Sequence, residues 1–104
     1  NKFLFFFLSL SPTKFLFSVP FVQGSVMACE YLLLNGAMMN VQDVEGNTPL
    51  HLATELGHTA QVCLLLKHRA DQHIKNLKEV EPLSIAVENA NADIVTLLVS
   101  YLNI

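Results

Sequence analysis

Two stretches of this chain repeat each other at a fixed distance of 33 residues. The segment NTPLHLATELGHTAQVCLLL (47–66) aligns with VEPLSIAVENANADIVTLLV (80–99), and proline, leucine, alanine and valine positions coincide along it. A constant step of this kind is typical of small units that cannot bury their own apolar faces and are stable only when stacked on neighbours. The repeat therefore predicts a stack of short units and not a fold built around one central element.

Each unit is predicted to be a pair of short helices joined by a turn. Thr48 can accept a backbone N–H as the N-cap of the first helix, and Pro49 suits the first helical position, where no donor is needed. Gly57 can end this helix, because glycine enters the left-handed backbone region without a Cβ penalty. Apolar residues at helical spacing predict a second helix from about Thr59 to Lys67.

The repeat also predicts how the chain is divided. We expect an all-α fold of about two and a half stacked helix-turn-helix units. Residues 1–23 are expected to be an apolar segment outside the domain, and residues 99–104 a tail outside the repeats. The repeats occupy residues 24–98, as a partial unit at 24–42, a full unit at 43–75 and a partial unit at 76–98.

The motif of the full unit resembles the ankyrin repeat. TPLH (48–51) is followed by GH and by LLLKHRAD (64–71), and the 33-residue spacing agrees. The resemblance implies an ankyrin-repeat solenoid. The last unit departs from the motif, with Glu81 in the place of threonine and Ser84 in the place of histidine. Arg69 stands where the finger turn carries glycine, and arginine in a left-handed turn costs about 1 kcal/mol.

A narrower resemblance is carried by GHTAQVCLLLKHRADQH (57–73) and PLSIAVENANADIVTLL (82–98). Both are similar to the ankyrin region of ACAP-type Arf GTPase-activating proteins, in which a coiled-coil BAR region, a PH domain and a zinc-finger GAP domain precede the repeats. The resemblance implies a cytoplasmic, endosome-associated chain whose repeats dock a protein partner, either a Rab-type GTPase or cargo. Contact with the membrane would be indirect, through the other domains.

Charge and cysteine content bear on the other function classes. Nine carboxylates against six basic groups give a formal net charge of −3 at pH 7, so no nucleic-acid partner is expected. A GAP zinc finger needs two CxxC pairs, and Cys29 and Cys63 form none. We therefore expect a non-enzymatic fragment without a cofactor, the zinc belonging to the parent family's GAP domain. The alternatives are a catalytic GTPase activator and an exported or membrane-attached ankyrin-like protein.

Four histidines raise the question of a metal site: His51, His58, His68 and His73. His51 and His58 match ankyrin positions whose imidazoles tie loops to the backbone. Structural roles are therefore expected for them, and no metal site.

The N-terminal segment contains all seven phenylalanines of the chain. A membrane-spanning helix needs about 20 apolar residues, and Pro12 and Lys14 interrupt the run too early. A signal peptide could begin at Lys2, although no small-x-small cleavage site follows. The codons of Phe, Leu, Ser and Pro can be pyrimidine-rich, and the run ends at Gln23, which CAG encodes. We favour a translated intron for residues 1–23 and also for residues 99–104, where an in-frame splice donor would encode Val99 and Ser100. For residues 1–23 the signal and the anchor are kept as alternatives.

The family resemblance also implies which residues contact a partner, because ankyrin proteins bind with their fingertips and first helices. All four basic residues after position 24 lie between positions 67 and 78, either as a solvated finger loop or as part of a docking patch. By register, the candidate partner-binding residues are Asp43, Glu45, Asn47, Glu55, Leu56, Lys75, Asn76, Lys78 and Glu79.

Overall fold

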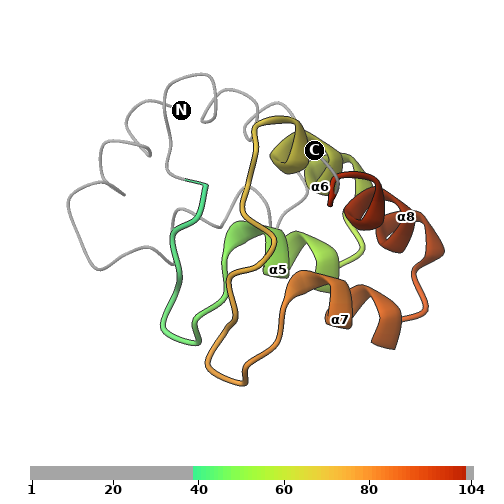
Figure 1. The fold of residues 1–104 in the computed structure, drawn as a ribbon. Coiled ribbons are helices and arrows are strands. Elements are labelled where there is room, and N and C mark those ends of the chain that lie inside the picture. The colour runs from blue at the N-terminus through green and yellow to red at the C-terminus, as the bar shows by residue number, and fades with distance from the viewer. Residues whose placement is uncertain (1–38, 103–104) are drawn as a thin grey trace.

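The computed structural model describes residues 39–102 of the chain, and every structural statement below concerns this part. It contains four helices: α5 (Pro49–Glu55), α6 (Thr59–Lys67), α7 (Pro82–Glu88) and α8 (Ala92–Ser100). The helices α5 and α7 lie side by side in one layer, and α6 and α8 lie side by side in a second layer (Figure 1). No strand occurs among the described residues, so the predicted all-α stack of helix pairs is confirmed.

Local sequence signals set the bounds of α5. The Thr48 hydroxyl accepts the backbone N–H of His51, and the His51 ring accepts the backbone N–H of Thr48, which together form a capping box. Pro49 takes the first helical position. After the C-cap, Gly57 has a φ of +74°, in the left-handed region. The predicted N-cap, the predicted helix stop and the predicted bounds of the second helix are all confirmed.

The second helix pair begins differently. Pro82 again takes the first position of α7, but the preceding Glu81 makes no side-chain cap bond. In α8 the side chain of Asn91 accepts the backbone N–H of Ile94 at 3.2 Å. This helix ends at Ser100, two residues beyond the repeat boundary at 98 that the sequence indicates.

The apolar core lies where the two helix pairs meet. Its members come from all four helices, and Leu83 and Val95 pack against them from the second pair. The burial stabilises the stack by about 25 cal/mol per Å² of apolar surface removed from water. The fully buried core side chains are Leu50, Ala53, Val62, Leu65, Ala86, Ile94 and Leu98.

Left-handed backbone recurs at equivalent positions of the two pairs. Gly46 and Gly57 have φ values of +81° and +74°, and the residues 33 positions later, Glu79 and Ala90, have +63° and +55°. Arg69, with φ +67°, is left-handed as expected from the sequence, but it directly follows the C-cap of α6 and does not lie at a fingertip. Each non-glycine residue in this region costs about 1–2 kcal/mol. The backbone N–H of each of the three donates to the carbonyl three residues earlier, which helps to offset this strain.

Several sequence-based predictions lie outside the described residues. They concern the apolar segment 1–23, the first partial unit up to residue 38, and Cys29. Among residues 39–102, no helix is long and apolar enough to cross a membrane.

Candidate partner-binding groove

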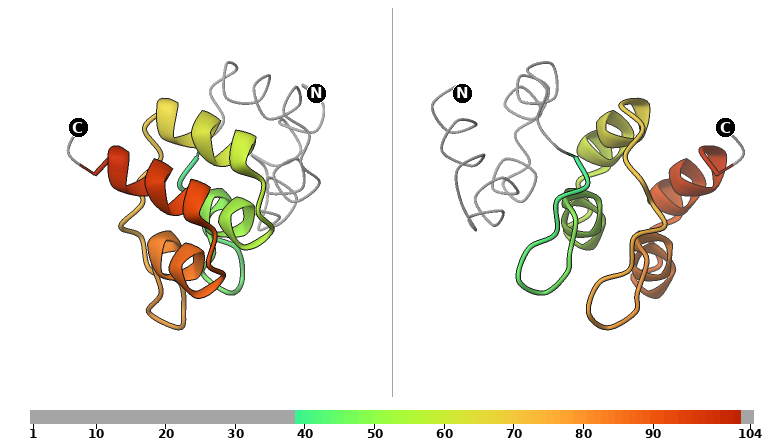
Figure 2. Two further views of the ribbon diagram at one scale, coloured as in Figure 1. Left: turned by 90° about the vertical axis from the view of Figure 1, so that its right-hand side faces the viewer. Right: turned by 60° about the vertical axis from the view of Figure 1, so that its left-hand side comes forward.

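Two finger-like loops project from the same side of the stack (Figure 2). We call residues 41–48 the first finger and residues 74–81 the second finger. The Asp43 carboxylate builds the first by accepting the backbone N–H groups of Glu45 and Asn47, each at 2.9 Å. At the equivalent position, the Asn76 amide oxygen accepts the N–H groups two and four residues later, at 2.9 and 3.1 Å. Both fingers therefore have the same side-chain-stabilised turn.

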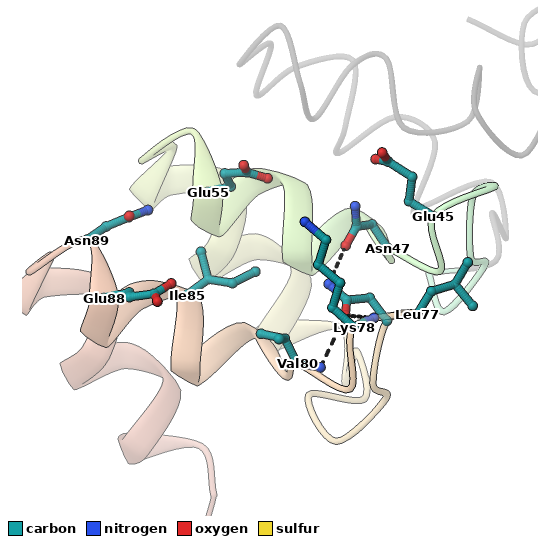
Figure 3. A pocket seen from close by; sticks show the side chains of 10 residues that line it. Glu45, Asn47, Glu55, Leu77, Lys78, Val80, Ile85, Glu88 and Asn89 are labelled. Atoms are coloured by element: carbon teal, nitrogen blue, oxygen red, sulfur yellow. Dashed lines mark hydrogen bonds between the residues drawn. The ribbon is translucent and has the colours of Figure 1, made fainter.

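The fingers are also bonded to each other. The backbone N–H of Leu77 donates to the carbonyl of Glu45 at 3.0 Å, and the Asn76 amide donates to the Asn47 side-chain oxygen at 2.9 Å (Figure 3). A Cβ on Gly46 would lie 2.7 Å from the Leu77 nitrogen, so only glycine permits this approach. The two fingers are thus presented as one paired structure.

His51 fixes the second finger to α5. Its Nδ1 lies 3.1 Å from the backbone nitrogen of Thr48, and its Nε2 lies 2.7 Å from the carbonyl oxygen of Val80. Because the Thr48 N–H can only donate and the Val80 carbonyl can only accept, the neutral ring carries its proton on Nε2. Burial lowers the pKa of His51, while the bond to Val80 opposes this shift. The structural role predicted for His51 is confirmed, and that of His58 stays a prediction.

A groove with a volume of about 490 Å³ is lined by the fingers and by the first helices of the two pairs. Its walls come from both fingers, from the end of α5 and from α7 (Figure 3). The lining residues are Glu45, Asn47, Glu55, Asn76, Leu77, Lys78, Val80, Ile85, Glu88 and Asn89.

The groove brings together five of the nine candidate residues: Glu45, Asn47, Glu55, Asn76 and Lys78. The two asparagines already bond to each other, and Asn47 is buried. The two glutamates and the lysine keep their charged groups available to a partner. Their role as partner contacts stays a prediction.

The other four candidates are not among the lining residues. The Asp43 carboxylate is used within the first finger, and Glu79 occupies the left-handed position of the second. Leu56 is the C-cap of α5 and 48% exposed. Lys75 is exposed, and its carbonyl accepts the Gln42 side-chain amide at 3.1 Å.

Sequence reasoning missed the apolar fingertips. Val44 and Leu77 occupy equivalent positions of the two fingers and are 82% and 75% exposed, the highest values among the exposed large apolar side chains. It also missed the part of the lining that α7 and its C-cap supply, with Ile85, Glu88 and Asn89. The available signal was the 33-residue step itself, because an apolar residue recurs at both fingertips.

The described part of the chain offers no metal site. No group of three or more His, Cys, Asp or Glu side chains there could hold an ion. His73, one of the four histidines considered, has its Nδ1 3.7 Å from a carboxylate oxygen of Glu81. The chemistry available at the groove is therefore that of contacts between charged, amide and apolar side chains.

Comparison with known proteins agrees with the fold. A family model described as ankyrin repeats (3 copies) matches residues 20–104. The chain is 56% identical over 75 residues to "Arf-GAP with coiled-coil, ANK repeat and PH domain-containing protein 2" of Gallus gallus, and 58% identical to the protein of that name from Homo sapiens. Each match covers 72% of this chain and 10% of the relative. A "putative ankyrin repeat protein" of Fowlpox virus is 36% identical over 77 residues, which cover 74% of this chain and 12% of the relative.

Proposed function

Because this chain belongs to the ankyrin-repeat family, we propose that it is a protein–protein interaction module that docks one protein partner in the groove between its fingers and α5 and α7. The observation that supports the proposal is the groove itself, in which two bonded fingers and two neighbouring helices surround a mixed charged and apolar lining. Such a mixture is typical of interfaces that form between separately folded proteins.

The groove is suited to docking because its walls are already ordered. Leu77 is bonded to Glu45, Asn76 is bonded to Asn47, and His51 is bonded to Val80. Binding a partner would therefore cost this chain little conformational entropy, which favours affinity. Loops without these bonds would lose part of that advantage.

The resemblance to Arf-GAP proteins suggests the setting in which the module works. We infer that the partner is a Rab-type GTPase or cargo at endosomal membranes, and that the chain acts in the cytoplasm. The chain spans about a tenth of the length of these relatives, so GTPase activation would belong to other parts of such a protein. The sequence has two cysteines in all, too few for the four thiolates of a GAP zinc finger.

Two alternatives rest on other features. A catalytic GTPase activator is the alternative that the relatives' name raises. An exported or membrane-attached protein is the alternative that residues 1–23 raise, and these lie outside the described part of the chain. A GTPase assay on the full chain tests the first, and determination of the N-terminus of the cellular protein tests the second.

The experiment that tests the proposed function uses the full chain and a panel of Rab-type GTPases, each loaded with GTP or GDP, in a calorimetric titration. Asn89→Arg places a long charged side chain in the groove, whereas Ser100→Arg adds the same side chain at the exposed end of α8. We expect Asn89→Arg to weaken binding at least tenfold and Ser100→Arg to leave it unchanged. Equal affinity of the two variants would contradict docking in the groove.

A further inference from the structure

Acidic side chains recur along the helical wall of the groove. Glu55 at the end of α5 and Glu88 at the end of α7 occupy the same position in consecutive units, and both are exposed (Figure 3). Glu45 adds a third carboxylate from the first finger, and Lys78 is the only basic residue among the lining residues. The groove therefore carries an excess of negative charge.

This negative charge is not neutralised locally. Within residues 39–102, the ion pair found is that of His73 with Glu81, and it does not involve the groove carboxylates. Exposed carboxylates that line the same groove repel one another at low ionic strength, and a cation bound among them lowers that repulsion. The field of the groove thus favours a positively charged occupant and disfavours an acidic one.

The fingertips offer the opposite chemistry. Leu77 lines the groove, and its equivalent Val44 lies on the neighbouring finger. Both side chains leave apolar surface exposed to water, which costs about 25 cal/mol of free energy per Å². We call Val44 and Leu77 the fingertip pair. An occupant that covers this pair with an apolar side chain would remove that cost.

We propose that the groove selects a cationic protein segment whose lysine or arginine side chains meet Glu55 and Glu88 and whose apolar side chain covers the fingertip pair. This assignment rests on the proposed function, and it names the chemistry of the partner surface. The combination of carboxylates and apolar tips excludes a phosphate-rich ligand, because the field repels it, and fits an amphipathic segment.

The test uses the ¹⁵N-labelled full chain and two designed helical peptides of about four turns. One peptide carries arginines beside a leucine stripe, and the other carries glutamates in place of the arginines. We expect the arginine peptide to shift the backbone amide signals of Leu77, Ile85 and Glu88, and the glutamate peptide to shift none of them. Equal effects of the two peptides, or shifts confined to α6 and α8, would overturn the proposal.

Matched variants separate charge from apolar contact. Glu88→Gln should weaken binding of the arginine peptide about three- to fivefold and reduce its salt dependence, whereas Asp93→Asn, on the exposed start of α8, should leave it unchanged. Leu77→Ser should weaken it about fivefold, whereas Val87→Ser, at an exposed position outside the groove lining, should not. Equal affinities within either pair would contradict the corresponding half of the proposal.

The same variants distinguish this proposal from the proposed function. If Asn89→Arg abolishes binding of a protein partner while Glu88→Gln and Leu77→Ser leave it intact, the cationic segment is wrong and docking in the groove stands. If Asn89→Arg leaves protein binding intact, docking in the groove is wrong as well.

Discussion

The two helix pairs of this chain have the same backbone but different local chemistry. The pair α5–α6 begins with the capping box of Thr48 and His51 and turns at Gly57. The pair α7–α8 has Glu81 without a side-chain cap bond and turns at Ala90 in the left-handed region. The comparison shows that a unit with poor local signals still forms, because its neighbour buries its apolar side.

Burial differs between the pairs in the same sense as the helix caps. Thr54 and Leu66 are buried, whereas their equivalents Val87 and Val99 are 60% and 45% exposed. The first pair therefore has both the better helix caps and the more complete burial. Within the described residues, the second pair leaves apolar side chains exposed at the equivalent positions. Position within the repeat sets the backbone, and the neighbour sets the burial.

The largest difference in stability loss between two equivalent substitutions in turns is expected for the left-handed glycines Gly46 and Gly57, with the greater loss at Gly46. Its added Cβ would meet the Leu77 nitrogen at 2.7 Å, whereas the atom nearest to a Cβ on Gly57 is the Asn91 amide at 3.7 Å. Gly46→Ala should lower the free energy of unfolding by about 2–3 kcal/mol, and Gly57→Ala by about 1 kcal/mol. Urea unfolding of both variants measures the difference, and equal losses would contradict the close contact of the fingers.

The next effect is the contribution of His51, for which the second pair has Ser84. Its pKa is lowered by burial, so the unfolded chain binds a proton more readily than the folded chain. The stability that neutral His51 contributes is fully present above its unfolded-state pKa near 6.5. It is lost as the pH falls through the lower pKa of the folded state.

His51→Ser removes this pH dependence together with one buried and one part-buried hydrogen bond, with an expected loss of about 2 kcal/mol at neutral pH. Thermal unfolding of wild type and variant between pH 7.5 and about 5 checks both effects. A variant that keeps the wild-type slope would show that another group titrates.

A gain in stability is expected from replacing Gln61, a buried polar side chain of the first pair whose equivalent in the second pair is apolar. The Gln61 amide nitrogen is buried and has no hydrogen-bond partner within the described structure, and its equivalent Ile94 is a core residue. Gln61→Ile should raise the free energy of unfolding by about 1 kcal/mol, because an unsatisfied buried amide is replaced by apolar surface. A loss of stability in denaturant unfolding would indicate that the amide has a partner.

The smallest change in stability is expected from replacing Ala90 of the second pair by glycine, the residue at the equivalent position of the first pair, Gly57. Ala90→Gly relieves the left-handed strain but increases the entropy of the unfolded chain, so a net gain of about 0.5 kcal/mol is expected. Ala92→Gly, at the helical start of α8, is the control and should destabilise by up to about 1 kcal/mol. Changes of the same sign in calorimetric melting would contradict the strain at Ala90.

Much of the fold could be predicted from the sequence, because it depends on local signals and on the repeat. The N-cap Thr48, the stop at Gly57, the bounds of α6 and the left-handed Arg69 all follow from residue type and position. The groove was predicted less well, because its apolar fingertip residue Leu77 was not among the candidates. The exposure of Leu77 depends on how the fingers pair, which no local pattern specifies.

The buried polar groups show the same limit. Gln61 lies on a helix whose apolar face was predicted correctly, yet nothing in its own sequence neighbourhood indicates that the amide is enclosed. Asn47 and Asp43 are predicted to contact a partner, and within this chain Asn47 bonds to Asn76 and Asp43 stabilises its own finger. Their role as partner contacts stays a prediction.

Comparing Leu66 with Val99 tests most directly the claim that each pair depends on its neighbour for burial. The two residues occupy equivalent positions, the first 3% and the second 45% exposed. The account predicts that Leu66→Ala lowers the free energy of unfolding by about 2–3 kcal/mol and Val99→Ala by less than about 0.5 kcal/mol. Equal losses from the two substitutions, measured by urea unfolding of the full chain, would contradict it.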